Sequence, residues 1–449
     1  MPRPGVLVTP IAPQEVSMNR RSFLAAAALT AARAETDSQL ALNGGTPVRT
    51  KPLTGPNWGP QYYEGEEQTQ LQEVLAGHNP FRFSNPVDKS KVALFENEYA
   101  ARMRTKYALA VTSGTAALHT AMVALEVGPG DEVILPAWTW YSCYNTILQV
   151  GALPVFAEID ESFNLDPADI EHRITPQTKV IMAVHLQGNP ADMDPILEIA
   201  RRRGLKVLED ASQSVGASYK GRPLGSMGDI AIYSLQQSKT ITAGEGGVVV
   251  TNDPYLYERA CRFHDVTVRR DFPTKLRFMP GLNYRMNEFT GGVLLAQIRK
   301  LDTIIGDVRR NARRVYRGIT DLPGTHPRRL PDPDGELGTG VFLGFRTKEL
   351  RDRYVQAMKA EGVPVSPPAG SVILPVVPEI EQKVTVTPRW PSFSSERGKS
   401  IRYGQECCPR TIDILSRFAG VMMSPKYTSQ DTDDAVAAVR KVYPAIVNA

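Results

Sequence analysis

The chain has 449 residues, of which 42% are hydrophobic and 22% are charged, and its net charge is +4. A hydrophobic fraction of this size can fill the cores of two or three domains, so the composition excludes a disordered chain and a small disulfide-stabilised scaffold. The near-balanced charge and the lack of a long apolar run in the sequence exclude a strongly basic nucleic-acid-binding protein and a membrane-spanning one. We therefore expect a globular protein with no nucleic-acid partner and no membrane span.

The four cysteines predict neither a metal site nor a disulfide framework. They form no CxxC pair and have no spacing typical of zinc ligands. Two of them, Cys407 and Cys408, are adjacent, and adjacent cysteines rarely bridge each other.

The N-terminus has the features of an export signal. Arg20 and Arg21 precede a short apolar run over residues 24–32, which ends in Ala32-Arg33-Ala34. Paired arginines, a short apolar run and an A-x-A end are together typical of a twin-arginine signal peptide, which exports proteins that have already folded. The alternative is a chance arginine pair before an alanine-rich helix in a cytoplasmic protein, with Met18 as a possible start. We expect export to the periplasm.

Between about residues 105 and 250, short apolar runs alternate with helical patterns. This alternation is typical of right-handed βα units, which build a mainly parallel sheet covered by helices on both faces. The apolar runs lie at residues 107–111, 132–135, 153–156, 179–184, 205–208, 230–234 and 247–251. We therefore predict an α/β fold whose large domain has a mainly parallel seven-stranded sheet.

The sequence from residue 287 to the C-terminus predicts a connecting helix and then a second, smaller domain. Residues 287–318 are rich in helix formers and contain no proline, so we expect a long connecting helix there. Beyond it we expect a strand at 341–346 and helices at 348–362 and 430–442. The predicted organisation is a signal peptide at 1–34, a large domain with an N-terminal segment and the connecting helix at 35–318, and a small α+β domain at 319–449.

Gly114 and Thr115 lie where a predicted strand turns into a helix. Small residues at such a turn let the backbone approach a ligand, and the helix dipole favours a phosphate there. A turn of this kind is common, so the motif alone does not establish a phosphate site. The P-loop pattern GxxxxGK[ST] is absent from the sequence.

Asp210 ends another predicted strand. Alternation along Leu208-Glu209-Asp210 sends Glu209 and Asp210 to opposite faces of the sheet. One carboxylate can then reach the carboxyl end of the strands, where open α/β sheets bind ligands. A helix N-cap is the alternative role for Asp210.

Lys239 lies between a predicted strand and the glycine-rich turn at 244–247. A lysine held in such a place loses solvent, which lowers its pKa and frees its amine as a nucleophile and base. A surface lysine is the default interpretation. The neighbouring glycines allow a close backbone approach and favour a functional role.

The phosphate turn, the aspartate and the lysine together match the needs of pyridoxal phosphate (PLP). The turn anchors the phosphate, Asp210 keeps the pyridine nitrogen protonated, and Lys239 forms the Schiff base. An opposite charge raises the pKa of such a nitrogen by about 1–3 units, so the ring can accept electrons. Spacing alone leaves alternatives open.

From Leu40 nearly to the C-terminus, the sequence resembles the DegT/DnrJ/StrS family of sugar aminotransferases. The resemblance implies the aspartate-aminotransferase fold, fold type I of the PLP-dependent enzymes. Three further segments, at 40–52, 236–239 and 401–411, are similar to members that aminate keto-cyclitols with glutamine as the donor. The family motifs are SGTAALH (113–119), GPGDEVILPAWTW (128–140), HLQGNPADMD (185–194), LEDASQSVGASYKGRPLGSMGD (208–229), SLQQSKTITAGEGG (234–247) and GLNYRMNEFTGG (281–292).

The resemblance implies roles for individual residues. Lys239 binds the cofactor and moves protons, and Asp210 is the partner of the pyridine nitrogen. The other cofactor-binding positions are Gly114, Thr115 and Ser234 at the phosphate, Trp140 stacked on the ring, Gln213 beside the phenolic oxygen, and Asn283 at the phosphate of the neighbouring subunit.

The last of these positions implies a homodimer with shared active sites. For Trp140, a place in the hydrophobic core is the alternative. His185 lies at a strand end near the predicted site, and whether it acts directly stays open.

We predict a PLP-dependent aminotransferase that moves an amino group from glutamine or glutamate to a keto-sugar or keto-cyclitol by a ping-pong mechanism. Gln236-Gln237 replaces the usual His-Pro of the sugar-aminating members, which puts a nucleotide-sugar acceptor in doubt. The intact lysine disfavours the family's dehydratases. The alternative is an exported PLP-binding protein without transaminase activity, and a nicotinamide oxidoreductase is disfavoured because no GxGxxG follows an early strand.

Replacing Arg20 and Arg21 by lysine should retain the protein in the cytoplasm and leave its activity unchanged, because the signal lies outside the family motifs. Cell fractionation and N-terminal sequencing measure both effects. A wild-type protein that stays in the cytoplasm with its N-terminus intact would contradict the export hypothesis.

Overall fold

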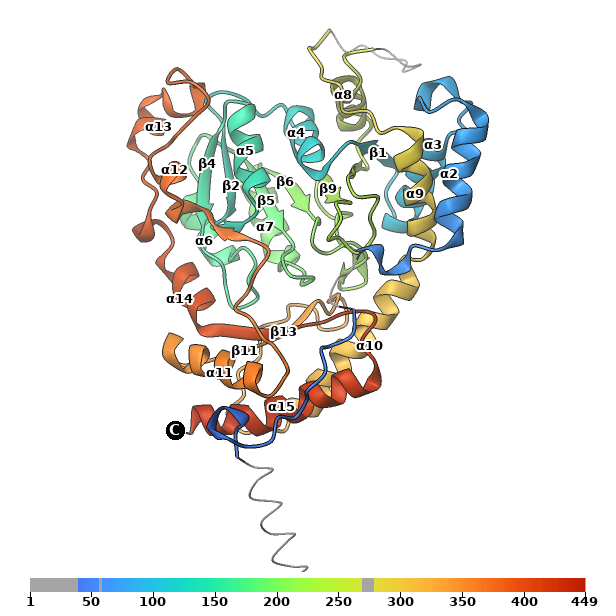
Figure 1. The fold of residues 1–449 in the computed structure, drawn as a ribbon. Helices are drawn as coiled ribbons and strands as arrows, with labels where there is room; N and C mark the ends of the chain where they lie inside the picture. The colour runs from blue at the N-terminus through green and yellow to red at the C-terminus, as the bar shows by residue number, and fades with distance from the viewer. Residues whose placement is uncertain (1–38, 56–58, 269–277, 449) are drawn as a thin grey trace, which may run out of the picture.

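The computed structural model describes residues 39–55, 59–268 and 278–448 (Figure 1). The predicted signal peptide at 1–34 lies outside the described residues. Within the described ranges, no helix is long and apolar enough to cross a membrane.

A seven-stranded sheet forms the centre of the large domain, with the strand order β1-β10-β9-β6-β5-β2-β4. Among these seven strands only β10 runs against the others, so the sheet is mainly parallel as predicted. The strands are almost continuously apolar because helices cover both faces. They are β1 (Tyr107–Val111), β2 (Glu132–Pro136), β4 (Leu153–Ala157), β5 (Thr178–Val184), β6 (Lys206–Asp210), β9 (Ile230–Ser234) and β10 (Gly247–Thr251), which confirms the seven predicted strands with small shifts at their ends.

The helices of the large domain form two layers and a group at one edge (Figure 1). The first layer contains α4 (Gly114–Ala124), α5 (Tyr141–Gln149) and α8 (Pro254–His264), and the second contains α6 (Pro167–Arg173) and α7 (Met193–Arg203). Beside β1, helices α2 (Gly65–Gly77), α3 (Lys91–Met103) and α9 (Glu288–Arg299) pack against one another. Helices α4 and α5 begin just after β1 and the short β3 (Trp138–Thr139), so their N-termini lie at the carboxyl ends of the strands.

The predicted connecting helix is divided into two helices. Helix α9 ends at Arg299 and α10 (Leu301–Ile319) begins after Lys300. The ammonium group of Lys300 donates to the carboxylate of Glu67 and to the carbonyl oxygen of Tyr62, both at 2.9 Å, which ties the junction to the N-terminal helices. The prediction of one unbroken helix was wrong: Lys300 is the C-cap of α9 and the N-cap of α10, and no glycine or proline at this position marks the break in the sequence.

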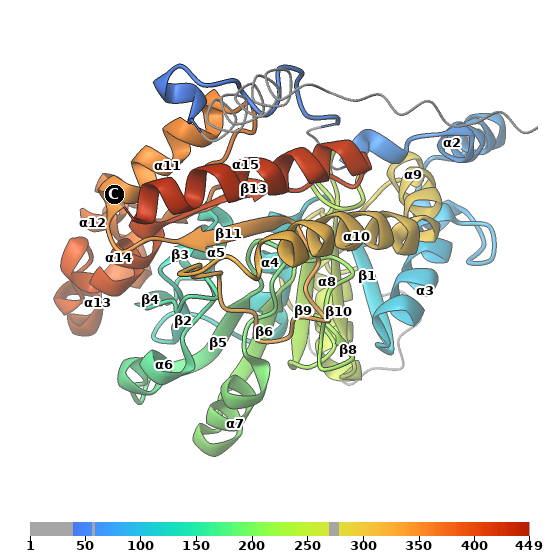
Figure 2. The same cartoon turned by 90° about the horizontal axis from the view of Figure 1, so that it is seen from below.

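The C-terminal region is built on a two-stranded antiparallel sheet of β11 (Gly340–Gly344) and β13 (Phe418–Met422). Around it pack α10, α11 (Lys348–Ala360), α14 (Pro409–Arg417) and α15 (Ser429–Val447). Figure 2 shows α10 and α15 side by side across these strands. The predicted strand and both predicted helices are confirmed, whereas the sequence did not predict β13 and α14.

Two segments, the N-terminal segment and strand β12 (Val372–Ile373), connect the large domain with the C-terminal region. The carboxylate of Glu361 accepts backbone N–H groups of Ala41 at 2.7 Å and Val48 at 3.0 Å, which holds the N-terminal segment on α11. Strand β12 pairs with β3 in a separate two-stranded sheet and so returns the chain to the large domain. The domain boundaries at 34/35 and 318/319 stay a prediction.

The short elements complete the description. They are β7 (Ser218–Tyr219), β8 (Arg222–Pro223), α12 (Pro378–Glu381), α13 (Glu396–Ser400) and the 3-10 helices η1 (Ala41–Asn43), η2 (Gly59–Tyr62), η3 (Arg82–Ser84), η4 (Leu374–Val376), η5 (Pro391–Phe393) and η6 (Gln405–Cys407).

Candidate active site

A cavity of about 430 Å³ opens at the carboxyl ends of β1, β6 and β9. This volume lies in the range of small-molecule sites, about 300–1,000 Å³. The cavity brings together the cofactor-binding residues that the sequence predicts, with the exception of Asn283. Those that line it are Gly114, Thr115, Trp140, Asp210, Gln213, Ser234 and Lys239.

The N-terminus of α4 forms one end of the cavity. Ser113 caps the helix by accepting a backbone N–H of the first turn at 3.0 Å. The N–H groups of Gly114 and Thr115 have no intrahelical acceptor, and the helix dipole adds positive potential. A Cβ on residue 114 would lie 2.7 Å from Cβ of Ser234, so only glycine allows the helix and β9 to approach this closely. Free amides beside the Thr115 and Ser234 hydroxyls fit a phosphate ester.

Asp210 lies at the end of β6 with its carboxylate in the cavity and 4% of the residue exposed. One carboxylate oxygen accepts the N–H of Ser212 at 2.9 Å, and the other accepts the thiol of Cys143 at 3.3 Å. In the described chain no helix begins at Asp210, so the N-cap alternative does not hold. Two neutral donors orient the carboxylate and leave its negative charge free to hold a proton on a ring nitrogen.

Glu209 points away from the cavity, as alternation along the strand predicts. Its carboxylate accepts three backbone N–H groups of residues 225–228 at 2.6–2.8 Å and lies 3.1 Å from Nε2 of His185. Burial raises the pKa of Glu209, but the hydrogen bonds from His185 and the backbone outweigh it, and the net pKa is lowered.

His185 does not line the cavity. Its Nε2 faces Glu209, and its Nδ1 accepts the backbone N–H of Ala191 at 3.0 Å. Both ring nitrogens are therefore engaged in the buried core. These contacts assign His185 a structural role and do not support the direct role that the sequence left open.

Lys239 lies in the loop that follows β9. Its backbone N–H donates to the carbonyl oxygen of Gln236 at 2.9 Å, and the Gln236 side chain accepts the N–H and hydroxyl of Ser238 at 2.9 and 2.7 Å. Burial lowers the pKa of the Lys239 amine, whereas the negative charge of Asp210 opposes this shift without cancelling it. The loop thus presents an amine that is more often neutral, and more nucleophilic, than a solvated lysine.

Trp140 and Trp138 show which tryptophan faces the cavity. Trp138 belongs to the core and is 2% exposed, whereas Trp140 is 51% exposed and lines the cavity. The core alternative for Trp140 is therefore excluded. An open indole face at this place suits a stacked aromatic ring.

Gln213 ties the cavity to the C-terminal region. Its amide group donates to the carbonyl oxygen of Gly370 at 3.2 Å and to the hydroxyl of Ser371 at 3.1 Å, and its oxygen accepts the N–H of Gln187 at 3.1 Å. Its role beside a phenolic oxygen stays a prediction.

Asn283 does not reach the cavity of its own chain. It is exposed, and its side-chain oxygen accepts a weak hydrogen bond from the N–H of Arg285, at 3.4 Å. A role at the phosphate of another subunit stays a prediction.

Sequence reasoning missed two residues of the site. The hydroxyl of Ser142 lies 2.7 Å from that of Thr115, and the thiol of Cys143 donates to Asp210. Cys143 lies three residues after Trp140, so a helix beginning at residue 141 places both on one face. That spacing is the sequence signal that could have identified Cys143 as a residue of the site.

An anion site at a helix N-terminus, a buried carboxylate, a lysine with a lowered pKa and an open indole ring fit the phosphate, the ring nitrogen, the aldehyde and the ring face of PLP. Together with the mainly parallel sheet and the small C-terminal region, this site defines a PLP-dependent enzyme of the aspartate-aminotransferase fold.

The chain belongs to the DegT/DnrJ/EryC1/StrS aminotransferase family, whose profile matches residues 64–369. It is 41% identical over 265 residues to a GDP-perosamine synthase of Escherichia coli O157:H7, covering 58% of this chain and 71% of that one. It is 33% identical over 375 residues to a putative L-glutamine:3-amino-2,3-dideoxy-scyllo-inosose aminotransferase of Micromonospora echinospora, covering 81% and 86%. Among solved structures, S. venezuelae DesV in complex with a ketimine intermediate has a TM-score of 0.67 and 30% identity, covering 84% of this chain and 94% of that one.

The protein is therefore a PLP-dependent aminotransferase of the sugar and cyclitol aminotransferase family.

Cofactor-free protein should attach PLP at Lys239 with an apparent pKa below 10.5, the ordinary value for lysine, because burial disfavours the ammonium form. Asp210→Asn should lower this pKa further, because it removes the charge that favours the ammonium. The rate of the absorbance change after PLP addition, measured against pH, gives both values. A midpoint at or above 10.5, or a borohydride-fixed label that peptide mapping finds on another lysine, would contradict the assignment.

Proposed function

We propose that the protein transfers an amino group from glutamine or glutamate to a keto-sugar or keto-cyclitol, in two half-reactions that share the cavity. The observation that carries this proposal is the pairing of Lys239 and Asp210 in one cavity, a base with a lowered pKa beside a fixed negative charge. Bound PLP supplies an electron sink for the carbanion that forms when the donor carbon loses its proton.

Each side chain then has a separate task. Asp210 holds the proton on the ring nitrogen, while Cys143 and Ser212 keep its carboxylate in place. Nζ of Lys239 takes the proton from the donor carbon and delivers it to the cofactor side of the C–N bond. With the ketone as substrate the same amine moves a proton in the opposite direction, so one base serves both half-reactions.

The lining of the cavity supports a polyhydroxylated acceptor. Hydroxyl groups of Ser142, Ser212 and Ser238 and the side-chain amide of Gln236 surround the space beside Lys239. Among the described residues that line the cavity, Lys239 is the single cation, so no second positive group serves the diphosphate of a nucleotide sugar. This supports a cyclitol or free sugar over a nucleotide-activated one.

Mixing the PLP-loaded protein with glutamine should convert the bound cofactor to its amine form in a single turnover. Asp210→Asn should slow this step at least about 100-fold, because a neutral ring nitrogen is a poor electron sink. Stopped-flow absorbance measures the rate. Asp413→Asn, which changes an exposed carboxylate on α14, is the matched control.

A rate for Asp210→Asn within about threefold of wild type, a barrier change of roughly 0.7 kcal/mol, would remove Asp210 from this role. A wild-type protein that responds to neither glutamine nor glutamate would overturn the proposed donor.

We also propose a homodimer with shared sites. Exposed apolar side chains, Phe81, Val266 and Leu282, surround the exposed Asn283. The guanidinium of Arg285 lies 5.5 Å from the ring centre of Phe81, and the N–H of Val266 donates to the carbonyl oxygen of Leu282 at 3.0 Å, so these exposed residues lie close to Asn283 in the fold. An exposed apolar patch of this kind is typical of an interface, and a second copy that covers it brings Asn283 to the partner's cavity.

Mixing Asn283→Ala chains with Lys239→Ala chains should restore activity, up to half per heterodimer. One site of the heterodimer then carries both defects and the other carries neither. Activity assays after confirmed subunit exchange measure the effect. If activity does not return, both residues serve the site of the same chain and the shared-site proposal fails.

A further inference from the structure

The glycine-rich turn at 244–247 brings a second carboxylate to the cavity of Lys239. Among the described residues that line this cavity, Asp210 and Glu245 are the two acidic ones. Asp210 is 4% exposed, and its charge serves the ring nitrogen of the cofactor. Glu245 is exposed, and within the described chain neither an ion pair nor a hydrogen bond engages its carboxylate. The chemistry of Lys239 and Asp210 does not use this second carboxylate.

The backbone on either side of Glu245 is bound to the loop that follows β9. The N–H of Gln237 donates to the carbonyl oxygen of Gly244 at 3.0 Å. The N–H of Leu235 donates to the carbonyl oxygen of Gly246 at 2.9 Å. Gly244 has a φ of 83°, which glycine adopts without strain. The turn that carries Glu245 and the loop that carries the reactive lysine are therefore held together as one unit.

Close packing behind the turn leaves Glu245 on its open side. A Cβ on residue 246 would lie 3.3–3.5 Å from side chains of the hydrophobic core, among them Leu294 and Met286. A Cβ on residue 247 would lie 2.3 Å from the carbonyl oxygen of Ser113, in the turn that precedes α4. Glycines at these two positions let the turn pack against the core and the predicted phosphate site, while Glu245 is exposed and lines the cavity.

The carboxylate of Glu245 differs in chemistry from its polar neighbours in the lining. The serine hydroxyls and the side-chain amide of Gln236 both donate and accept hydrogen bonds, whereas an ionised carboxylate only accepts them. Hydrogen bonds from hydroxyl groups to a carboxylate are among the stronger ones in proteins. A polyhydroxylated ring carries hydroxyl donors on the carbons next to its ketone, but glutamine and glutamate carry no hydroxyl on their carbon chains.

We propose that Glu245 is a specificity-determining residue that accepts a hydrogen bond from a hydroxyl on a carbon next to the ketone of the acceptor. These carbons stay close to Lys239 when the ketone reacts there, and Glu245 lines the same cavity. A carboxylate offers no hydrogen bond to the carboxylate of an amino-acid donor, so Glu245 distinguishes the two substrates that share the cavity. This inference rests on the proposed function, because it names a residue that recognises the proposed acceptor.

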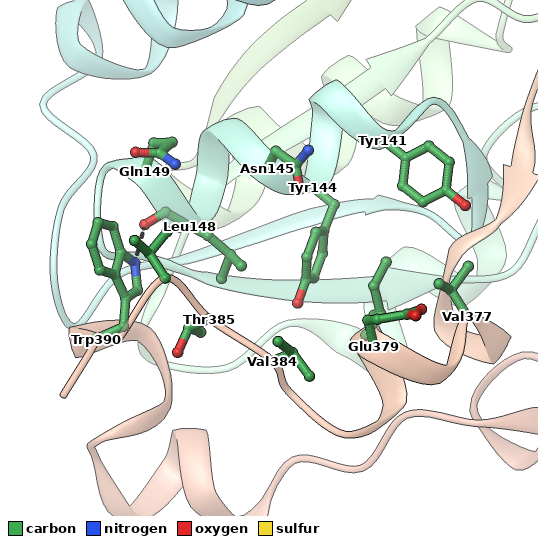
Figure 3. Close-up of a pocket in the computed structure, with 12 residues that line it drawn as sticks. Tyr141, Tyr144, Asn145, Leu148, Gln149, Val377, Glu379, Val384, Thr385 and Trp390 are labelled. Atoms are coloured by element: carbon green, nitrogen blue, oxygen red, sulfur yellow. Dashed lines mark hydrogen bonds between the residues drawn. The ribbon is translucent and has the colours of Figure 1, made fainter. Parts of the chain in front are cut away.

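A separate cavity of about 340 Å³, between α5 and residues 377–390, provides the matched control (Figure 3). Glu379 of α12 lines this cavity and is exposed. None of the described residues that line it also lines the cavity of Lys239. Glu379→Gln therefore removes the charge of an exposed glutamate outside the active-site lining.

The test uses the reverse half-reaction, in which the amine form of the acceptor gives its amino group to the PLP-loaded enzyme and leaves as the ketone. The probes are scyllo-inosamine for the cyclitols and 3-amino-3-deoxyglucose for the sugars. Each is paired with its 2-deoxy derivative, which lacks one hydroxyl next to the amine, and glutamine is the reference substrate without a hydroxyl. Stopped-flow absorbance gives the second-order rate constant of each for wild type, Glu245→Gln and Glu379→Gln.

We expect Glu245→Gln to lower the ratio of the polyol to the glutamine rate constant about tenfold, or about 1.4 kcal/mol, because a hydrogen bond to a charged group is lost. In the wild type, the 2-deoxy derivative should react about tenfold more slowly than the full polyol. In Glu245→Gln this difference should shrink to about twofold, because the hydroxyl has lost its partner. Glu379→Gln should match the wild type. A purely structural defect of the turn would lower the glutamine and polyol rates alike and preserve the 2-deoxy difference.

Three results would overturn the inference. An unchanged ratio in Glu245→Gln shows that the carboxylate does not contact the acceptor, and a 2-deoxy difference that persists in this variant shows that the hydroxyl is not its partner. If glutamine reacts but neither polyol amine does, the proposed acceptor is wrong and the inference falls with it. If glutamine and glutamate also fail, the proposed function fails first, so the amino-acid arm separates the two failures.

Discussion

The carboxylate of Glu209 is the contact on which the position of the active site depends. It accepts three backbone N–H groups of residues 225–228 and faces Nε2 of His185, all in the buried core. These bonds hold the turn that precedes β9 against β6, and β9 in turn carries Ser234 and leads to Lys239. Removing a partner from a buried charge of this kind is strongly destabilising, by about 3–5 kcal/mol.

The two adjacent carboxylates on β6 thus divide structure and chemistry between them. Glu209 points into the core and meets donors on every side, whereas Asp210 points into the cavity and meets only two neutral donors. The pleat of the strand produces this division, because successive side chains point to opposite faces. A strand whose register slipped by one residue would exchange the two roles.

The cavity draws its residues from segments that are far apart in the chain. The turn at 113–115, helix α5, the end of β6, the loop after β9 and the segment at 370–371 meet at one edge of the sheet. Parallel strands place their carboxyl ends at the same edge, so each new strand adds a loop to the same site. The C-terminal region adds Gly370 to the lining of the cavity, and the hydroxyl of Ser371 accepts a hydrogen bond from Gln213.

Much of this could be predicted from the sequence. The seven strands of the large sheet and the opposite directions of Glu209 and Asp210 follow from patterns that are local in the chain. The grouping of Gly114, Asp210 and Lys239 was predicted from the needs of one cofactor, and Ser234 was added to it by the family resemblance. Apolar alternation and strand-to-helix turns are short-range signals, and the order of the sheet then decides where they meet. The roles of the individual cofactor-binding residues, and the place of Asn283 in a partner subunit, stay predictions.

Only the tertiary structure decided which residues that are distant in the chain contact one another. Lys300 lies at the break in the connecting helix, where its ammonium donates to Glu67, more than 200 residues away. Cys143 serves Asp210, and His185 serves the core, because the packing of α5 and β6 places them there. No sequence pattern indicates that the buried hydroxyl of Tyr144 has no hydrogen-bond partner among the described residues, because this depends on which side chains pack around it in the folded chain. Local patterns determine elements and their faces, whereas contacts between distant residues exist only once the chain has folded.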